Sequence, residues 1–161
     1  MRPKSLIFEI CRWVAVVLAL VVLILQFGGN TVSSANAEDV AAAVTQVMDM
    51  SNMQRADNQM LKRLYGLDPS AYESCILYYP NTNMMAEEIL VVKLQDVAQQ
   101  QAVLDAAQSR LDTQKNTFEG YGVEQFDLLT NHSILEARGN FVLFVVGSQC
   151  DAARNAFVDA L

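Results

Sequence analysis

Two adjacent glutamates, Glu87 and Glu88, are of a residue type that can do acid–base chemistry. A pair of carboxylates serves as general acid and general base when both reach one substrate. Neighbouring residues of a strand point to opposite faces, so these two are poorly placed to act together. We expect Glu88 instead to accept backbone N–H groups of the preceding loop, "PNTNMMA". Glu88, and Asn83 in that loop, are therefore candidate ligand-contacting or loop-organising residues.

Nucleophilic and metal-assisted chemistry lack their usual partners. His132 is the single histidine, and we expect it on an exposed edge strand. No serine lies in a G-x-S-x-G elbow. No His/Cys spacing suits zinc, and no glycine-rich loop follows a strand and opens a helix. The sequence therefore predicts no catalytic residue, no cofactor-binding residue and no metal site of these kinds.

Methionines are grouped in two places. Met48, Met50 and Met53 form an M-x-M-x-x-M run, and Met84 and Met85 are adjacent in the loop after the first predicted strand. Thioether sulfur is a soft ligand that can select Cu(I). Methionine also fills gaps between helices and a core. We favour the packing role and keep Cu(I) binding as the minor alternative.

The segment "TQKNTFEGYG" places an aromatic residue between two glycines where a long helix is expected to end. Phe118 continues the apolar stripe of that helix, so we expect it to be the last core contact. Gly120 suits the left-handed conformation that terminates helices. Tyr121 either folds back as an anchor, which we favour, or contacts a ligand. It is the third candidate site residue.

Helices are expected on both sides of these candidate residues. Val97, Leu104, Leu111 and Phe118 recur every seventh residue and predict one apolar stripe along a long helix. Other segments show helical spacing together with capping residues or terminating glycines. The predicted helices are residues 37–50, 58–65, 96–118 and 149–160, with a short one in "VEQFDLL".

Four β-prone segments are predicted as strands. "EILVVKL" (88–94) and "FVLFVV" (141–146) are apolar on both faces, which is typical of central strands. "HSILEAR" (132–138) alternates as an edge strand does, and Gly139-Asn140 after it is a two-residue hairpin signal. With "SCILYY" (74–79), these segments predict an antiparallel sheet whose second and fourth strands are central and adjacent.

The elements together predict an α+β fold of two layers. Its sheet has four antiparallel strands, and the helices pack on one face. Because the central strands are apolar on both faces, the second face also needs cover. The candidates are the 37–50 helix and a partner protein.

The N-terminal segment is strongly apolar after a basic start. Residues 13–25, "WVAVVLALVVLIL", carry no polar side chain except the Trp13 N–H, and Arg2 and Lys4 precede them. A span over residues 5–27 would measure roughly 34 Å, enough to cross a bilayer core. This indicates an uncleaved, single-pass anchor that places the C-terminal domain outside the cell membrane. The alternative is a signal peptide cleaved after Ala37, which would leave a secreted protein.

The predicted organisation is a signal-anchor or signal peptide at 1–27, a tether at 28–36 and an extracytoplasmic domain at 37–161.

The charge beyond the apolar segment is acidic. Without Arg2, Lys4, Glu9 and Arg12, the chain has 8 basic and 17 acidic residues, a net charge of −9. Such a surface repels phosphate backbones, so we expect no nucleic acid partner.

Two cysteines, Cys75 and Cys150, would lie in an oxidising compartment if the domain is exported. The spacing leaves open whether they form a disulfide or remain partly buried thiols, and we favour the thiols.

Four stretches of the chain resemble one bacterial family, known only as domain of unknown function 4358. They are "LKRLYGLDPSAYES", "NMMAEEILVVKL", "RLDTQKNTFEGYGVEQFDLL" and "RGNFVLFVVG". The resemblance covers roughly residues 40–160, in order and with similar spacing. It implies a small extracytoplasmic protein, commonly of Gram-positive anaerobes, that carries an N-terminal export segment. The lipoprotein signal that many members carry is absent here. The resemblance implies no established activity and therefore no catalytic residues.

Two classes of function remain open on these grounds. The first is a non-catalytic binding or interaction module, tethered to the membrane through residues 5–27 and facing an envelope protein partner. The second is an envelope enzyme whose carboxylate site is distributed along the chain. We favour the first, because no catalytic constellation is recognisable.

Overall fold

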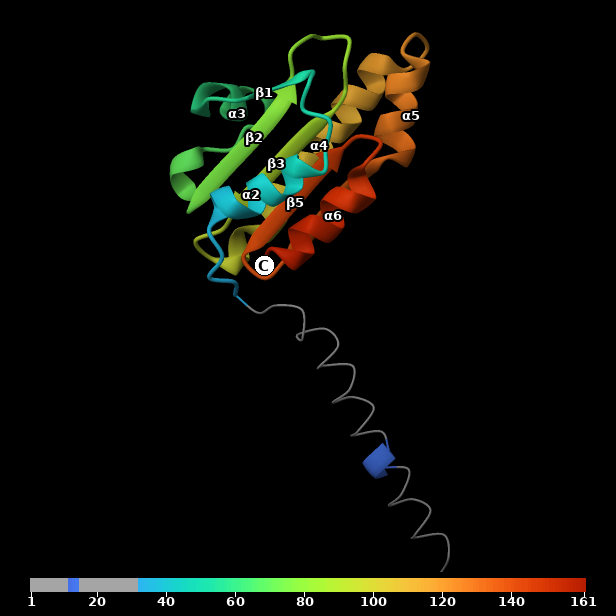
Figure 1. The fold of residues 1–161 in the computed structure, drawn as a ribbon. Helices are drawn as coiled ribbons and strands as arrows, with labels where there is room; N and C mark the ends of the chain where they lie inside the picture. Colours follow the sequence, from blue (N-terminus) through green and yellow to red (C-terminus); the bar gives the residue numbers. More distant parts are fainter. Residues whose placement is uncertain (1–11, 15–31) are drawn as a thin grey trace, which may run out of the picture. The chain divides into compact units, whose positions relative to one another are not determined.

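The computed structural model describes residues 12–14, which are helical, and residues 32–161. The chain divides into two units, 1–31 and 32–161, and the fold below is that of the second (Figure 1). Apart from residues 12–14, the predicted 5–27 span lies outside the described residues, so it stays a prediction. Within the part of the chain that is described, no helix combines the length and apolar character needed to cross a bilayer.

Five antiparallel strands form one sheet in the order β1-β2-β3-β5-β4. Their bounds are β1 Met53–Arg55, β2 Ser74–Pro80, β3 Glu88–Lys93, β4 Ser133–Arg138 and β5 Phe141–Val146. The predicted adjacency of the two apolar strands is confirmed, because β3 pairs with β5 from Glu88↔Val146 to Lys93↔Phe141. Every residue of both strands is buried. The strand β1 was not predicted, because three residues at the edge of β2 leave no period-two pattern to detect.

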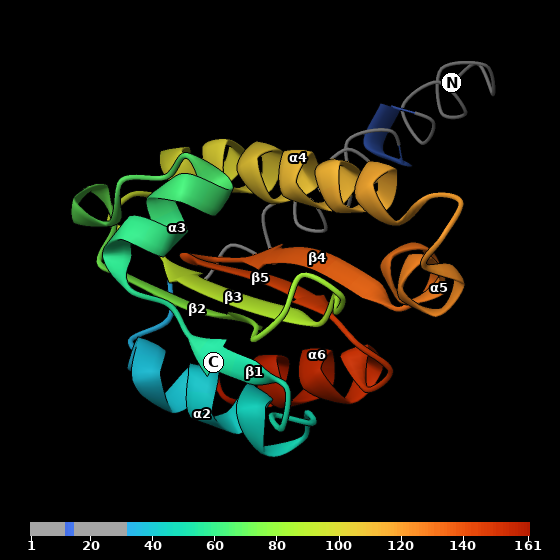
Figure 2. The same cartoon turned by 90° about the horizontal axis from the view of Figure 1, so that it is seen from above.

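Helices cover both faces of this sheet, so the prediction of helices on one face is wrong. The five helices are α2 Ala37–Gln46, α3 Asn58–Tyr65, α4 Gln100–Phe118, α5 Val123–Asn131 and α6 Cys150–Asp159. Figure 2 shows α2 and α6 on one face and α3 and α4 on the other, with α5 at the end of the sheet. The protein is therefore a three-layer rather than a two-layer α+β fold.

Two separate cores explain this arrangement. Ile89 and Val91 of β3 pack with α2 and α6, whereas Leu90 and Val92 pack with α3, α4 and α5. Alternate residues of a strand point to opposite faces, so a strand that is apolar throughout must be covered twice. The 37–50 segment supplies part of the second cover, as α2, and the C-terminal helix supplies the rest.

Local sequence signals set the ends of the helices that surround the site. Asp57 caps α3 by accepting the N–H of Met60 at 2.8 Å, and Gly66 ends the helix with φ 68°. α4 begins after a 3₁₀ turn, Val97–Gln99, and ends at Phe118, two residues before Gly120 with φ 88°. Both glycines adopt the left-handed conformation that a side chain with a Cβ disfavours.

Candidate functional site

A fully buried acid, Glu88, organises the site at the start of β3. Its Oε1 accepts the hydroxyl of Tyr65 at 2.5 Å. Its Oε2 accepts Nη2 of Arg110 at 2.8 Å and Nε2 of Gln114 at 2.9 Å. The Nε of Arg110 lies 3.2 Å from both carboxylate oxygens. Three side chains from two helices therefore converge on one carboxylate.

The helices place these partners by simple spacing. Arg110 and Gln114 lie one turn apart on α4 and share the face that points to the sheet. Tyr65 is the last residue of α3, and its ring packs edge-on against Phe144 with centroids 6.4 Å apart. The polar cluster thus sits within the core between the sheet and the two helices.

The groups of this cluster shift the pKa values of one another. Burial first, and the charge of Glu88 second, raise the pKa of Tyr65 well above its ordinary value, so the phenol stays a neutral donor. Burial, the largest single influence, would lower the pKa of Arg110, but the hydrogen bonds and the charge of Glu88, together with Tyr65, outweigh it and raise this pKa. A carboxylate in a low-dielectric core needs such a paired cation together with hydrogen-bond donors. Glu88 consequently holds Arg110 and Gln114 in one position.

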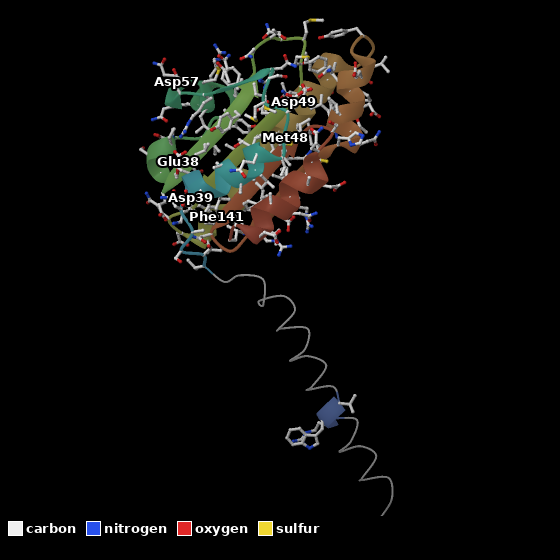
Figure 3. All side chains as sticks on the ribbon, in the orientation of Figure 1. Glu38, Asp39, Met48, Asp49, Asp57 and Phe141 are labelled. Atoms are coloured by element: carbon white, nitrogen blue, oxygen red, sulfur yellow. The ribbon has the colours of Figure 1, made fainter. Side chains whose placement is uncertain are left out.

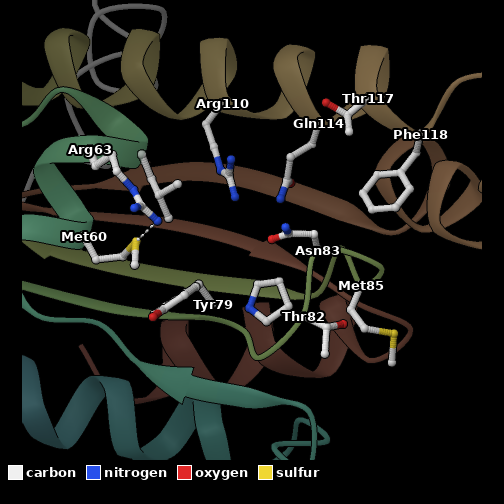
Figure 4. Close-up of a pocket in the computed structure, with 12 residues that line it drawn as sticks. Met60, Arg63, Tyr79, Thr82, Asn83, Met85, Arg110, Gln114, Thr117 and Phe118 are labelled. Atoms are coloured by element: carbon white, nitrogen blue, oxygen red, sulfur yellow. Dashed lines mark hydrogen bonds between the residues drawn. The ribbon is translucent and has the colours of Figure 1, made fainter.

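A pocket of about 210 Å³ lies directly above this cluster, between α3, α4 and the loop that joins β2 to β3. Figure 4 shows Arg110 and Gln114 reaching into it from α4, with Asn83 facing them from the loop. Two arginines and several neutral polar and apolar side chains form its wall, and none of the described residues contributes a carboxylate to it. The lining residues are Met60, Arg63, Leu64, Tyr79, Pro80, Thr82, Asn83, Met85, Arg110, Gln114, Thr117 and Phe118.

One lining residue carries a buried acceptor that has no partner within the part of the chain that the structure describes. The Nε2 of Gln114 must face Glu88, because a carboxylate oxygen can only accept, and this assigns the amide orientation. The Oε1 of Gln114 is then a buried acceptor without a hydrogen bond among residues 12–14 and 32–161. A buried acceptor of this kind needs a donor from water or from a bound molecule.

The three predicted site residues lie at different distances from this pocket. Asn83 lines it, and Glu88 lies beneath its floor. Tyr121 is 60% exposed and lies outside the lining, with its ring 5.9 Å from that of Phe118, which does line the pocket. The expected fold-back of Tyr121 is present, and a ligand contact by Tyr121 stays a prediction.

The prediction that Glu88 accepts backbone N–H groups of the preceding loop is wrong. Side chains of two helices use its acceptor capacity instead. The loop is held by another residue, since the N–H of Ala86 donates to Oε1 of Gln125 at 2.8 Å. The physical reason is burial: at the first position of a central strand, the carboxylate points into the core and away from the loop backbone.

Sequence reasoning missed Arg63, Tyr65, Arg110 and Gln114. For two of them a signal was present. Arg110 and Gln114 fall on the inward face of the 100–118 helix, three and seven residues after the fully buried Ala107. Polar residues within an apolar stripe indicate a buried partner, but the helical period does not say which one.

Two other candidate chemistries are placed elsewhere. Met48 and Met53 are buried in the core beneath α2, so their thioethers serve packing and do not favour Cu(I). His132 ends α5 directly before β4 instead of lying within that strand. Its side chain is 43% exposed, with Nε2 3.8 Å from a carboxylate oxygen of Asp127.

Both described cysteines are free thiols. Cys75 packs with the core on the α4 side of the sheet, whereas Cys150 belongs to the core on the α2 side. The sheet therefore separates them, and the disulfide alternative does not apply to this fold. Burial raises the pKa of Cys75 to about 12, and burial followed by Asp151 raises that of Cys150.

Comparison with known proteins gives one result. Residues 33–147 match the model of a family described as Domain of unknown function (DUF4358). No curated protein and no solved structure matches the chain. The matched region is more than half of the chain, and it contains Glu88, all three of its partners and the whole pocket wall. On this evidence, the protein belongs to the DUF4358 family that its sequence resembles.

Proposed function

We propose that this protein is a non-catalytic binding module of the cell envelope, and that the pocket between α3 and α4 holds its ligand. The observation that carries the proposal is the bonding of Glu88. A carboxylate that is fully buried and bonded to Tyr65, Arg110 and Gln114 builds a rigid floor for a site. Pre-positioned side chains of this kind reduce the entropy lost on binding.

The chemistry of the wall supports binding over catalysis. A general base must lie within hydrogen-bond reach of a proton on the substrate. The described residues that line the pocket include no Asp, Glu, His, Cys or Lys, and the hydroxyl of Thr117 already donates to the carbonyl of Thr113 at 2.9 Å. An enzyme with a distributed carboxylate site would need an acid in this wall. The pocket gives that alternative no support.

The start of the folded unit supports attachment through residues 5–27. Asn36 caps α2, and Ala37 is its first residue and is buried. Upstream, the N–H of Ser33 donates to Oδ1 of Asn140 at 2.8 Å. Cleavage after Ala37 would remove the cap and this bond, at a cost of about 1 kcal/mol for the cap alone. Retention of residues 5–27 keeps the cap and this bond in place. In this proposal the domain lies outside the membrane, near partners in the same membrane.

The binding function is tested with the full chain in detergent micelles and a small-molecule extract of the host envelope. Saturation-transfer NMR would detect the compounds that bind. Thr117→Trp fills the pocket, and Asn116→Trp is the matched control, because both residues are exposed on α4 and only Thr117 lines the wall. We expect signals that persist with Asn116→Trp and disappear with Thr117→Trp. Absence of binding, or equal binding by both variants, would contradict the proposal.

The attachment is tested separately by intact mass of the native protein. A species that keeps residues 5–27 in the membrane fraction is expected. Recovery from the culture medium of a chain that begins at Glu38 would show that the protein is secreted instead.

A further inference from the structure

We propose that the pocket binds a small monoanionic carboxylate that also carries a neutral N–H or O–H donor. Hydroxy acids and N-acylated amino acids belong to this class. The inference rests on the proposed binding function and names the chemistry of the ligand.

The charge at the pocket is +1. Arg63 and Arg110 lie in the wall, and Glu88 beneath the floor cancels one of them. Arg63 makes no ion pair within the described residues, and its Nη2 donates only to the sulfur of Met60 at 3.0 Å. A monoanion neutralises this site. A phosphate, with a charge of about −1.5 to −2 at pH 7, would leave excess negative charge in a half-enclosed space.

Several acidic residues lie far from the pocket. Glu38, Asp39 and Asp49 lie around α2, on the opposite face of the sheet from the pocket (Figures 2 and 3). One exposed acid, Asp57, shares a neighbouring recess with Arg63. Asp57 is exposed and accepts the N–H of Met60, so water screens it from the ligand. An anion that enters the pocket therefore meets guanidinium groups before carboxylates.

The geometry of the donors favours a carboxylate. Nε and Nη2 of Arg110 are bonded to Glu88, and its Nη1 bonds to no carboxylate of the described residues. Arg63 offers a second guanidinium from α3. Planar guanidinium groups match the two oxygens of a carboxylate and form short, charge-assisted bonds with it.

The need for a donor follows from Gln114. Its Oε1 is a buried acceptor without a partner in residues 32–161. The hydroxyl of Thr117 donates its hydrogen bond to the carbonyl oxygen of Thr113, so toward a ligand its oxygen can only accept. Among residues 12–14 and 32–161, no carboxylate lines the wall to pair with an ammonium group, so the complementary ligand group is a neutral N–H or O–H.

The size of the pocket sets an upper limit on the ligand. Its volume of about 210 Å³ is below the roughly 300–1,000 Å³ that is usual for drug-sized ligands. A short acid with one acyl or hydroxyl substituent fits this space, whereas a nucleotide or an oligosaccharide does not.

The test uses the full chain in detergent and three probes: N-acetyl-L-alanine, its neutral analogue N-acetyl-L-alaninamide, and inorganic phosphate. We expect saturable binding of the acid, with a Kd of about 1 mM, by NMR titration. The amide and phosphate should bind at least about tenfold more weakly. Arg63→Gln should weaken binding of the acid about tenfold. Lys62→Gln removes the same charge from the same helix outside the pocket and should change it less than about twofold.

Each contrary result is informative. Equal binding of the acid and the amide would refute the carboxylate, and tighter binding of phosphate would refute the monoanion. Equal losses of affinity for the acid in Arg63→Gln and Lys62→Gln would show that binding depends only on the net charge of the surface, which would refute a specific contact with Arg63. A further outcome is that the extract contains a compound whose binding is abolished by Thr117→Trp, while N-acetyl-L-alanine does not bind. In that case the proposed ligand class is wrong and the binding function stands. If neither experiment finds a pocket ligand, both are wrong.

Discussion

Replacing Arg110 with methionine removes the cation that compensates a fully buried acid. Arg110→Met keeps the helical stem but deletes the bonds to Glu88 at 2.8 and 3.2 Å. Glu88 is 0% exposed and retains only Tyr65 and Gln114 as partners. Removing one member of a buried ion pair typically costs about 3–5 kcal/mol, because the remaining charge is desolvated without compensation. For a folded unit of this size, we expect Tm to fall by roughly 10–20 °C.

A second substitution separates the charge effect from the loss of packing. Glu88→Gln in the Arg110→Met background removes the unpaired charge and retains an amide oxygen that can accept from Tyr65 or Gln114. We expect this double variant to regain about 2 kcal/mol relative to Arg110→Met. The measurement is urea denaturation of the full chain, followed by far-ultraviolet circular dichroism, and the coupling energy comes from the double-mutant cycle.

Arg63→Met is the matched control, because Arg63 lines the same pocket but is exposed and bonds to no carboxylate of the described residues. Its free energy of unfolding should change by less than about 0.5 kcal/mol. A loss below about 1 kcal/mol in Arg110→Met, or no recovery in the double variant, would refute the idea that Arg110 compensates Glu88 within the core.

Three further predictions concern other parts of the fold. Burial raises the pKa of Cys75 from 9.0 to about 12, so alkylation of this thiol at pH 8 should be slower on the order of a thousandfold in the folded chain than in the chain unfolded in urea. Peptide mapping would measure both alkylation rates, and equal rates would contradict the burial of Cys75. Because the pKa of buried Tyr65 is raised, its phenol ionises first in the unfolded chain above pH 10, so the native state loses stability as pH rises. The difference in unfolding free energy between wild type and Tyr65→Phe should therefore narrow there by up to about 1.4 kcal/mol per pH unit. A difference that stays constant with pH would argue against a buried phenol. In Gly122→Ala, the new Cβ would lie 2.5 Å from Cδ1 of Phe118, so the free energy of unfolding measured in urea should fall by about 1–3 kcal/mol. An unchanged urea midpoint would mean that the Phe118 ring moves aside freely.

Local signals in the sequence were sufficient for most elements of the sheet and for several helix ends. The hairpin at Gly139 and the αL termini at Gly66 and Gly120 follow from backbone conformations that favour glycine. The apolar runs of β3 and β5 predicted their central, adjacent places, because a strand buried on both faces must lie inside a sheet. Each of these signals is carried by residues within a few positions of one another, so the sequence alone contains it.

Tertiary structure decided which helices cover each face and which side chains meet Glu88. Glu88 is separated from Tyr65 by 23 residues, from Arg110 by 22 and from Gln114 by 26. Periodicity shows that a residue of α4 faces inward, but it does not show which strand residue lies opposite it. The pocket charge and the unpartnered Gln114 oxygen arise only when α3, α4 and the β2–β3 loop are brought together. The reason is that burial and ion pairing depend on distances in space, and packing of the whole domain sets these distances.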